Sequence, residues 1–186
     1  MTDKTVFLNG LAEQVTGAGA YRAALIGVSD IRLDAAFRDM CASNVCGNYG
    51  KCWMCPPDIG DIETLMNKLR TYDYALVYQT VGTLEDSYDF EGMMEAGERH
   101  NKLTRRLTEL FTKDKFTRML HLGAGGCRLC PVCAKKQNLP CRHPEAALSS
   151  LEAYGVNVSE LAAACGMKYI NGQNTVTYFG AVFFVL

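Results

Sequence analysis

The chain has 186 residues, of which 48% are hydrophobic, and its 19 basic and 20 acidic residues leave a net charge of −1. We expect a chain of this length to form one domain, residues 1–186, that buries roughly 70% of its unfolded surface without help from a metal. Non-specific binding of nucleic acid normally requires a basic surface, and no basic stripe is visible. We therefore expect no nucleic-acid partner.

The chain begins Met1-Thr-Asp-Lys, which lacks the charged and then apolar layout of a signal peptide, so we expect a cytoplasmic protein. Its longest apolar run, Phe179 to Leu186, is far shorter than the ~20 residues of a membrane-spanning helix, so we expect no membrane association. In a reducing cytoplasm, clustered cysteines indicate metal ligands rather than disulfides.

The first third of the chain is predicted to form a strand, two helices and a loop. Tyr21 to Ser29 (YRAALIGVS) has the composition of a strand, and a short helix is expected near Ile31 to Arg38. A loop rich in Gly, Pro and Asn follows, and Asp61 is the expected N-cap of the next helix. Apolar residues of this helix recur at i, i+3, i+4 and i+7. They are Ile62, Leu65, Met66 and Leu69.

The middle of the chain is predicted to form a strand, a long helix and a second strand. Tyr74 to Val81 (YALVYQTV) is rich in β-branched and aromatic residues, which favours a strand. Glu91 to Thr112 carries a continuous apolar stripe at helical spacing. The stripe consists of Met93, Ala96, His100, Leu103, Leu107 and Leu110. Arg118 to Leu122 is the next expected strand, and the glycines that begin at Gly123 turn it into a second loop.

The last part of the chain is predicted to form two helical stretches, near Pro144 to Tyr154 and Ser159 to Gly166. Thr175 to Leu186 is an apolar strand that should be central or well covered. Because strands and helices alternate, we expect an α/β fold: a single layered domain with a roughly four-stranded mixed sheet and helices packed on it. Two cysteine-rich loops, at about 41–60 and 123–144, should leave the ends of regular elements.

Eight of the nine cysteines fall into two groups. The first group, with C-x4-C-x5-C-x2-C spacing, is Cys41, Cys46, Cys52 and Cys55. The second group, with C-x2-C-x2-C-x7-C spacing, is Cys127, Cys130, Cys133 and Cys141. Four thiolates on a short loop match the ligands of a four-iron cluster or of a tetrahedral zinc ion.

The spacing of the second group favours an iron–sulfur cluster. A C-x2-C-x2-C run followed by a more distant cysteine is the arrangement of bacterial ferredoxins, whereas zinc sites more often show two separated C-x2-C pairs. The first group is less diagnostic, because its spacing also suits zinc. A further alternative is that the two loops exchange ligands, each contributing to both centres.

The stretch CGNYGKCWMCPP, together with GAGGCRLCPVCAKKQNLPCRHPEAALSSLEAYGVNV, resembles a bacterial and archaeal family of predicted metal-binding proteins, domain of unknown function 2284. The likeness runs from about Tyr21 to the C-terminal Thr177-Tyr-Phe-Gly. It implies metal binding through all eight cysteines of the two groups, and it implies no particular reaction.

Other residues that could be metal ligands or catalytic groups have simpler explanations. Cys165 lies in an apolar helical stretch and is expected to be a small buried hydrophobe. His100 and His121 fall on buried faces and are expected to be hydrogen-bonded core histidines. Arg142 and His143 follow Cys141 directly, so they either donate hydrogen bonds to cluster sulfur or form a solvated loop pair. No nucleophile motif, phosphate loop or dinucleotide fingerprint is present, so no catalytic residue is indicated.

The sequence thus favours a cytoplasmic protein of an anaerobe with two [4Fe-4S] clusters, which transfers single electrons to or from a partner enzyme. An electron carrier or accessory redox protein is favoured over a stand-alone enzyme. Two alternatives stay open: a zinc-binding structural or interaction module, and a cluster enzyme that acts on a small molecule. The oligomeric state, including a homodimer, is left open.

Overall fold

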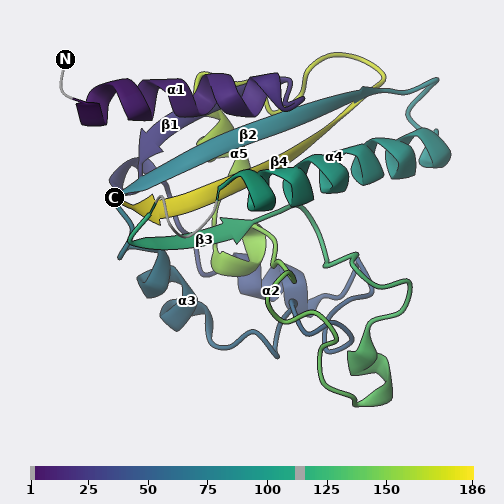
Figure 1. Ribbon diagram of the computed structural model, residues 1–186. Coiled ribbons are helices and arrows are strands. Elements are labelled where there is room, and N and C mark those ends of the chain that lie inside the picture. The colour runs from purple at the N-terminus through teal and green to yellow at the C-terminus, as the bar shows by residue number, and fades with distance from the viewer. Residues whose placement is uncertain (1–2, 112–115) are drawn as a thin grey trace.

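The computed structural model describes residues 3–111 and 116–186, and Figure 1 shows the arrangement of its elements. Five α-helices and four strands lie in these ranges. The helices are α1 (Asp3–Gly17), α2 (Phe37–Ala42), α3 (Ile62–Leu69), α4 (Phe90–Leu110) and α5 (Val158–Ala164). The strands are β1 (Arg22–Gly27), β2 (Tyr74–Thr83), β3 (Arg118–Leu122) and β4 (Thr175–Val185). The short 3₁₀ turns are η1 (Val28–Asp30), η3 (Ala134–Gln137) and η4 (Glu152–Tyr154).

The four strands form one sheet in the order β1-β2-β4-β3, which confirms the expected α/β class and strand number. Each of the three pairings is antiparallel, so the expectation of a mixed sheet is corrected. The reason is the place of β4. Strands β2 and β3, joined through α4, run in the same direction, but β4 is inserted between them and pairs antiparallel with both.

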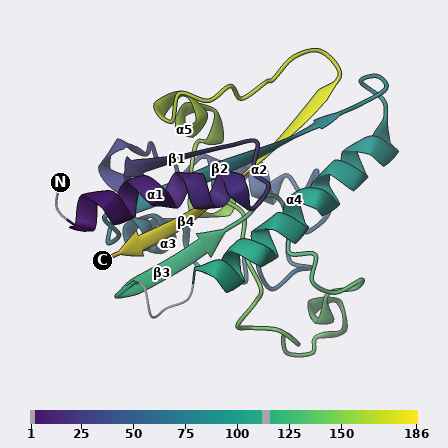
Figure 2. The ribbon, with the colours of Figure 1, turned by 45° about the horizontal axis from the view of Figure 1, so that its top comes forward.

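Helices cover both faces of the sheet. Side chains alternate along β2, so that Leu76 and Tyr78 pack with residues of α1 and α4, whereas Ala75 and Val77 pack with residues of α3 and α5. Figure 2 shows α1 and α4 crossing the same face of the sheet. Strand β4, at the centre, is buried along most of its length, as its apolar composition predicted. None of the described helices is long and apolar enough to cross a membrane.

Local signals in the sequence explain where several elements begin. The Asp61 carboxylate accepts a hydrogen bond from the Thr64 backbone N–H, as expected of the N-cap of α3. Asp89 accepts one from Gly92 N–H and caps α4, the predicted long helix. The predicted end of that helix at Thr112 lies outside the described residues.

Three segments differ from the sequence prediction. Helix α1 was not anticipated, because Asn9 and Gly10 interrupt its apolar stripe, yet it packs Leu11 and Val15 against the sheet. The short second helix begins only at Phe37. Residues 144–154 hold turns and η4 rather than an α-helix. There, the backbone around Ser149–Leu151 pairs with Gly123 instead, with N–H···O distances of 2.9 and 3.1 Å.

Both core histidines are hydrogen-bonded, as predicted. The Nδ1 atom of His100 lies 2.9 Å from Thr80 Oγ1. The two ring nitrogens of His121 lie 2.8 Å from the hydroxyls of Tyr78 and Thr108. Burial lowers the pKa of His100 to about 4 and that of His121 to about 3, because a desolvated ring resists protonation. These two rings are therefore neutral parts of the core.

Candidate metal centre

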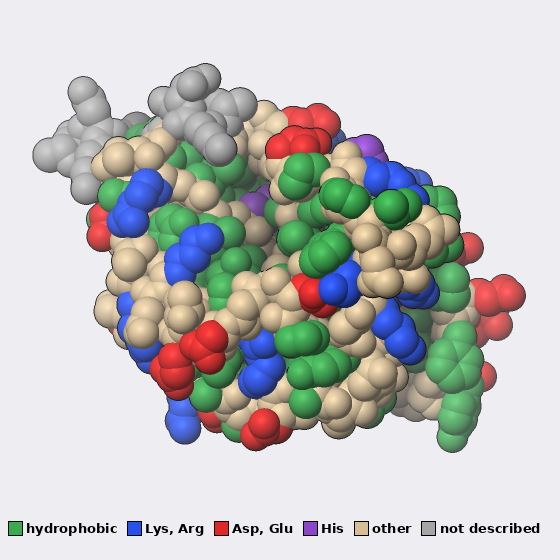
Figure 3. All heavy atoms as spheres, turned by 90° about the horizontal axis from the view of Figure 1, so that it is seen from below, with side chains coloured by type: hydrophobic (Ala, Val, Ile, Leu, Met, Phe, Trp, Pro, Cys, Tyr) green, Lys and Arg blue, Asp and Glu red, His purple; other side chains and the backbone are tan. Residues whose placement is uncertain are grey.

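The two cysteine loops lie side by side at one end of the molecule, below the sheet in Figure 1. The first loop connects α2 to α3, and the second follows β3. Figure 3 looks onto this end, where hydrophobic side chains are interspersed with Lys and Arg. The first loop leaves α2 and the second leaves the sheet at the end of β3, and cysteines that are far apart in the sequence come together here.

Side chains of the first loop bind the second loop directly. The indole Nε1–H of Trp53 donates a 2.8 Å hydrogen bond to the carbonyl oxygen of Leu139. The Lys135 ammonium lies 4.1 Å from the centre of the Trp53 ring, a cation–π contact. The same ammonium forms an ion pair with the carboxylate of Asp58, and both side chains are largely buried. These contacts hold the loops together through groups other than cysteine.

Five of the eight predicted ligands line one small cavity between the loops, about 20 Å³ in volume. Four come from the second loop and one from the first: Cys127, Cys130, Cys133, Cys141 and Cys52. Trp53, Met54 and Leu129 contribute apolar walls. The cavity therefore combines sulfur donors with side chains that exclude water.

Cys52 is the most buried of these five, with 2% of its surface exposed. Its pKa is lowered to about 6, first by a hydrogen bond with the Cys55 thiol, and further by the backbone N–H groups of Met54 and Cys127 and the thiol of Cys133. These bonds stabilise a thiolate against the opposing effect of burial. A cysteine whose thiolate form is favoured in this way is suited to bind a metal.

The other three cysteines of the first loop lie near one another. The hydrogen bond with Cys52 raises the pKa of Cys55 most, followed by burial and by the negative charges of Cys52, Cys46 and Cys41. Burial raises the pKa of Cys41, which Arg38 lowers and the charges of Cys46 and Glu152 raise further. Each of these thiols therefore resists ionisation, and a bound cation would favour the thiolate forms by offsetting their negative charges.

The donor chemistry fits a metal centre, although ligand geometry is not preformed. Within residues 3–111 and 116–186, no three His, Cys, Asp or Glu side chains form a group that could hold a metal ion. All nine cysteines are free thiols. Eight soft sulfur donors on adjoining loops suit iron–sulfur clusters and zinc, and do not suit magnesium or calcium. The grouping of the eight cysteines into two ligand sets stays a prediction.

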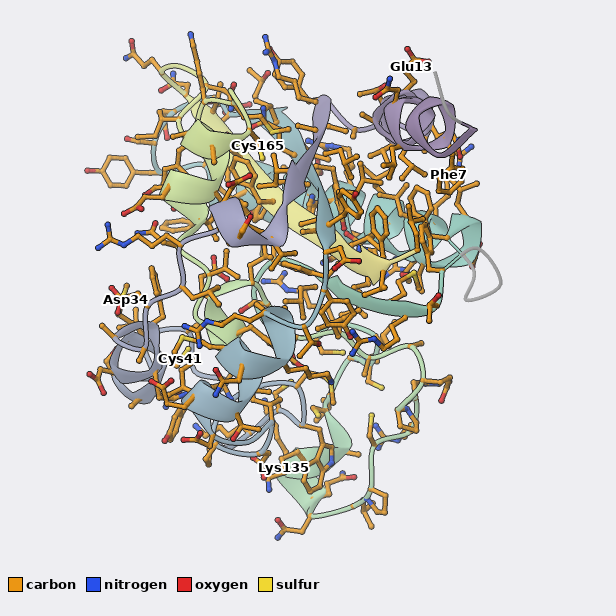
Figure 4. All side chains as sticks on the ribbon, turned by 90° about the vertical axis from the view of Figure 1, so that its left-hand side faces the viewer. Phe7, Glu13, Asp34, Cys41, Lys135 and Cys165 are labelled. Atoms are coloured by element: carbon orange, nitrogen blue, oxygen red, sulfur yellow. The ribbon has the colours of Figure 1, made fainter. Side chains whose placement is uncertain are left out.

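The residues next to these cysteines have distinct surroundings. Arg142 and His143 both line the cavity, and Arg142 Nη1 donates a 3.0 Å hydrogen bond to the carbonyl of Val132. Cys165 follows α5 and packs against the part of the core that contains residues of α3 and α5. Burial raises its pKa to about 11. Figure 4 shows Cys165 near the sheet, away from Cys41 and Lys135.

Sequence reasoning missed four charged residues at this end of the molecule. Lys135 and Asp58 join the loops, whereas Arg38 and Glu152 act electrostatically on Cys41. Burial raises the pKa of Glu152. These four residues belong to no sequence motif, and they matter only because folding places them beside the other loop or beside Cys41. Only the position of Arg38, three residues before Cys41 at helical spacing, offered a local signal.

Comparisons with known proteins agree with this donor set. No curated protein and no solved structure matches the chain. A family model described as "Predicted metal-binding protein (DUF2284)" matches residues 24–184, a range that contains both cysteine loops and all four strands except the first two residues of β1 and the last residue of β4. The chain therefore belongs to this family of predicted metal-binding proteins.

Proposed function

We propose that this is an iron–sulfur protein with two [4Fe-4S] clusters that exchanges single electrons with a partner protein in the cytoplasm. The ligands would be the eight cysteines of the two loops. They are Cys41, Cys46, Cys52, Cys55, Cys127, Cys130, Cys133 and Cys141. The observation that carries the proposal is the cavity in which five of these cysteines, from both loops, lie among apolar walls.

The chain's own groups suit such a role. The backbone groups of Met54 and Cys127 favour the thiolate form of Cys52 and lower its pKa, and N–H···S bonds to a ligand sulfur raise the reduction potential of a cluster. Trp53 and Met54 line the cavity with apolar surface that disfavours water, which also affects the potential. A [4Fe-4S] cluster would supply a one-electron couple whose potential these groups set.

A structural zinc module is the second candidate, and one observation favours it. The loop between the end of α2 at Ala42 and the start of α3 at Ile62 contains no helix or strand. A bound metal that cross-links a long irregular loop stabilises it more than it would a short one. Thiolates are ligands of zinc as well as of iron. In that case the centres would order the loops and would have no redox activity.

The two candidates differ in metal content and in response to reductant. Protein purified without oxygen after iron-replete expression should be brown, with iron and acid-labile sulfide at roughly eight each per chain. Chemical reduction should give a paramagnetic signal that disappears on reoxidation, with little change in the circular dichroism spectrum. Colourless protein with stoichiometric zinc would establish the structural module instead. Iron centres that break down on reduction would exclude an electron carrier.

A further inference from the structure

A second cavity lies beside the thiol-lined one, between α4 and the start of the second cysteine loop. It has a volume of about 40 Å³, and its lining includes Asn101, Arg105 and Arg128 together with the turn at residues 123–126. One buried water needs about 10–15 Å³ of such volume, so the cavity has room for a group of a few heavy atoms. Cys127 lines both cavities, so a group bound here would lie next to a predicted metal ligand.

A wider groove adjoins this cavity on the surface of α4. The groove has a volume of about 490 Å³. It shares three lining residues with the cavity, namely Asn101, Arg105 and Arg128. A small molecule therefore has room to place one end in the cavity and the remainder in the groove.

Two arginines from different elements meet at this junction. Arg105 lies on α4 one turn after Asn101, on the same helix face, and Arg128 belongs to the cysteine loop. Within the described residues, neither arginine side chain forms a hydrogen bond or an ion pair. Both side chains are exposed, so a ligand from solution can reach their guanidinium groups.

The three carboxylates that line the groove do not neutralise these arginines. Glu95 is paired with Arg99, and Glu98 is paired with Lys102. Glu91 lies in the first turn of α4, about 21 Å along the helix axis from the arginine of that helix. Two positive charges therefore remain at the end of the groove that adjoins the cavity.

The turn at residues 123–126 supplies donors of a second kind. Gly125 has a φ of 64°, and the backbone N–H groups of Ala124, Gly125 and Gly126 donate to no backbone carbonyl among the described residues. Successive N–H groups in turns of this kind form concave sites for anions. Packing holds the turn in place, because a Cβ on Gly126 would lie 2.9 Å from the side chain of Asn48 in the first loop.

We propose that this cavity binds the phosphate group of a small molecule through Arg105, Arg128 and the backbone N–H groups of residues 124–126. Two guanidinium groups match the charge of a phosphate group, which is close to −2 at neutral pH, whereas a single carboxylate would leave one of them unmatched. The proposal adds a ligand site to the electron transfer proposed above. It does not depend on which metal the cysteines hold.

The first test measures the binding of inorganic phosphate by calorimetry, with chloride at equal ionic strength as the reference. Binding should weaken at least tenfold in Arg105→Gln and Arg128→Gln, and also in Arg105→Lys, because lysine keeps the charge but lacks the planar fork. The matched control is Arg106→Gln. Arg106 is the next residue on α4 but donates to the carbonyl of Ala18 and lines no part of the cavity, so this variant should bind like the wild type.

Unchanged binding in either Arg105→Gln or Arg128→Gln, or no binding by the wild type, would overturn the proposal. If these variants do not fold, as judged by circular dichroism, the melting temperature of the wild type takes their place. Phosphate should raise it more than chloride does at equal ionic strength, and an equal effect of the two salts would overturn phosphate binding.

Two other probes identify the class of ligand. Acetate should bind the wild type at least tenfold more weakly than phosphate, and acetate binding of equal strength would overturn the proposal in favour of a carboxylate site. Methyl phosphate should bind within a few-fold of inorganic phosphate, because the groove has room for the rest of an ester. Binding of inorganic phosphate without binding of methyl phosphate would exclude a phosphate ester as the ligand.

Spectroscopy of the reduced iron-loaded protein separates this inference from the proposed function. Phosphate bound beside Cys127 should give a ³¹P hyperfine coupling to a paramagnetic centre in the second loop. Intact paramagnetic centres without this coupling would overturn the inferred location alone. Colourless zinc protein that binds phosphate and loses binding in the arginine variants would overturn the proposed function and support this inference.

Discussion

Trp53 in the first cysteine loop donates a 2.8 Å hydrogen bond from its indole nitrogen to the carbonyl oxygen of Leu139 in the second loop. The Lys135 ammonium, 4.1 Å from the centre of the same ring, is paired with Asp58. One indole thus joins the loops by a hydrogen bond and a cation–π contact. The positions of the cysteines on the two loops depend on these contacts.

Replacing Lys135 by Ala should destabilise the protein by about 1–3 kcal/mol, because the largely buried Asp58 carboxylate would lose its partner. The cation–π contact with Trp53 would also be lost. The measurement is the free energy of unfolding in urea. Lys136→Ala, at the neighbouring exposed position, is the matched control and should change that value by less than about 0.5 kcal/mol. Equal effects of the two changes would mean that the Lys135 contacts contribute little.

Cys165→Ser should leave the metal content intact, whereas Cys130→Ser should remove roughly one centre, about four of eight iron atoms if both centres are four-iron clusters. Cys165 packs against the core, and Cys130 lines the cavity between the loops. Elemental analysis and sulfide determination on anaerobically purified protein distinguish the two. Metal loss of the same size in Cys165→Ser would place the ninth cysteine among the ligands.

Stability should fall as the pH decreases from about 6.5 toward 4, because of the two core histidines. Burial lowers the pKa of His100 to about 4 and of His121 to about 3 in the folded protein, so the unfolded chain takes up protons first. The two rings contribute fully to the free energy of unfolding above pH 6.5. Below that pH, this free energy falls by up to about 1.4 kcal/mol per pH unit for each ring.

The measurement is urea denaturation at pH 7 and pH 5. His121→Gln should reduce the pH dependence, and His143→Gln, at an exposed position in the second loop, is the control that should preserve it. A pH dependence that is the same in all three proteins would show that carboxylates or cysteines cause it instead.

Gly180→Ala should destabilise the protein by about 3 kcal/mol, because the added methyl group would overlap the Tyr78 ring and hydroxyl in the core. Tyr78 cannot move away easily, since its hydroxyl is bound to both Thr104 and His121. Thermal unfolding measures the effect. Gly17→Ala is the control: its methyl group would meet no atom within 4 Å, so stability should be unchanged or slightly higher.

The sequence by itself determined the elements whose patterns are strong and local. The Asp61 cap and the apolar stripe that contains His100 placed α3 and α4. The β-branched and aromatic content of one segment placed β2, and a long apolar run placed β4. Cysteine spacing alone indicated a sulfur-rich metal-binding protein, in agreement with the family that the chain belongs to. These features depend on residues that are close together in the sequence, so periodicity and spacing are enough to predict them.

Tertiary structure alone decided which distant groups meet. The insertion of β4 between β2 and β3 made the sheet antiparallel, and pairing of Ser150 with Gly123 replaced a predicted helix. The same packing placed Cys52 in the cavity of the other loop and left two nitrogens of Arg38 without a hydrogen-bond partner among the described residues. Such contacts join residues far apart in the chain. They depend on how the sheet and its connections are arranged in space, which no local pattern encodes.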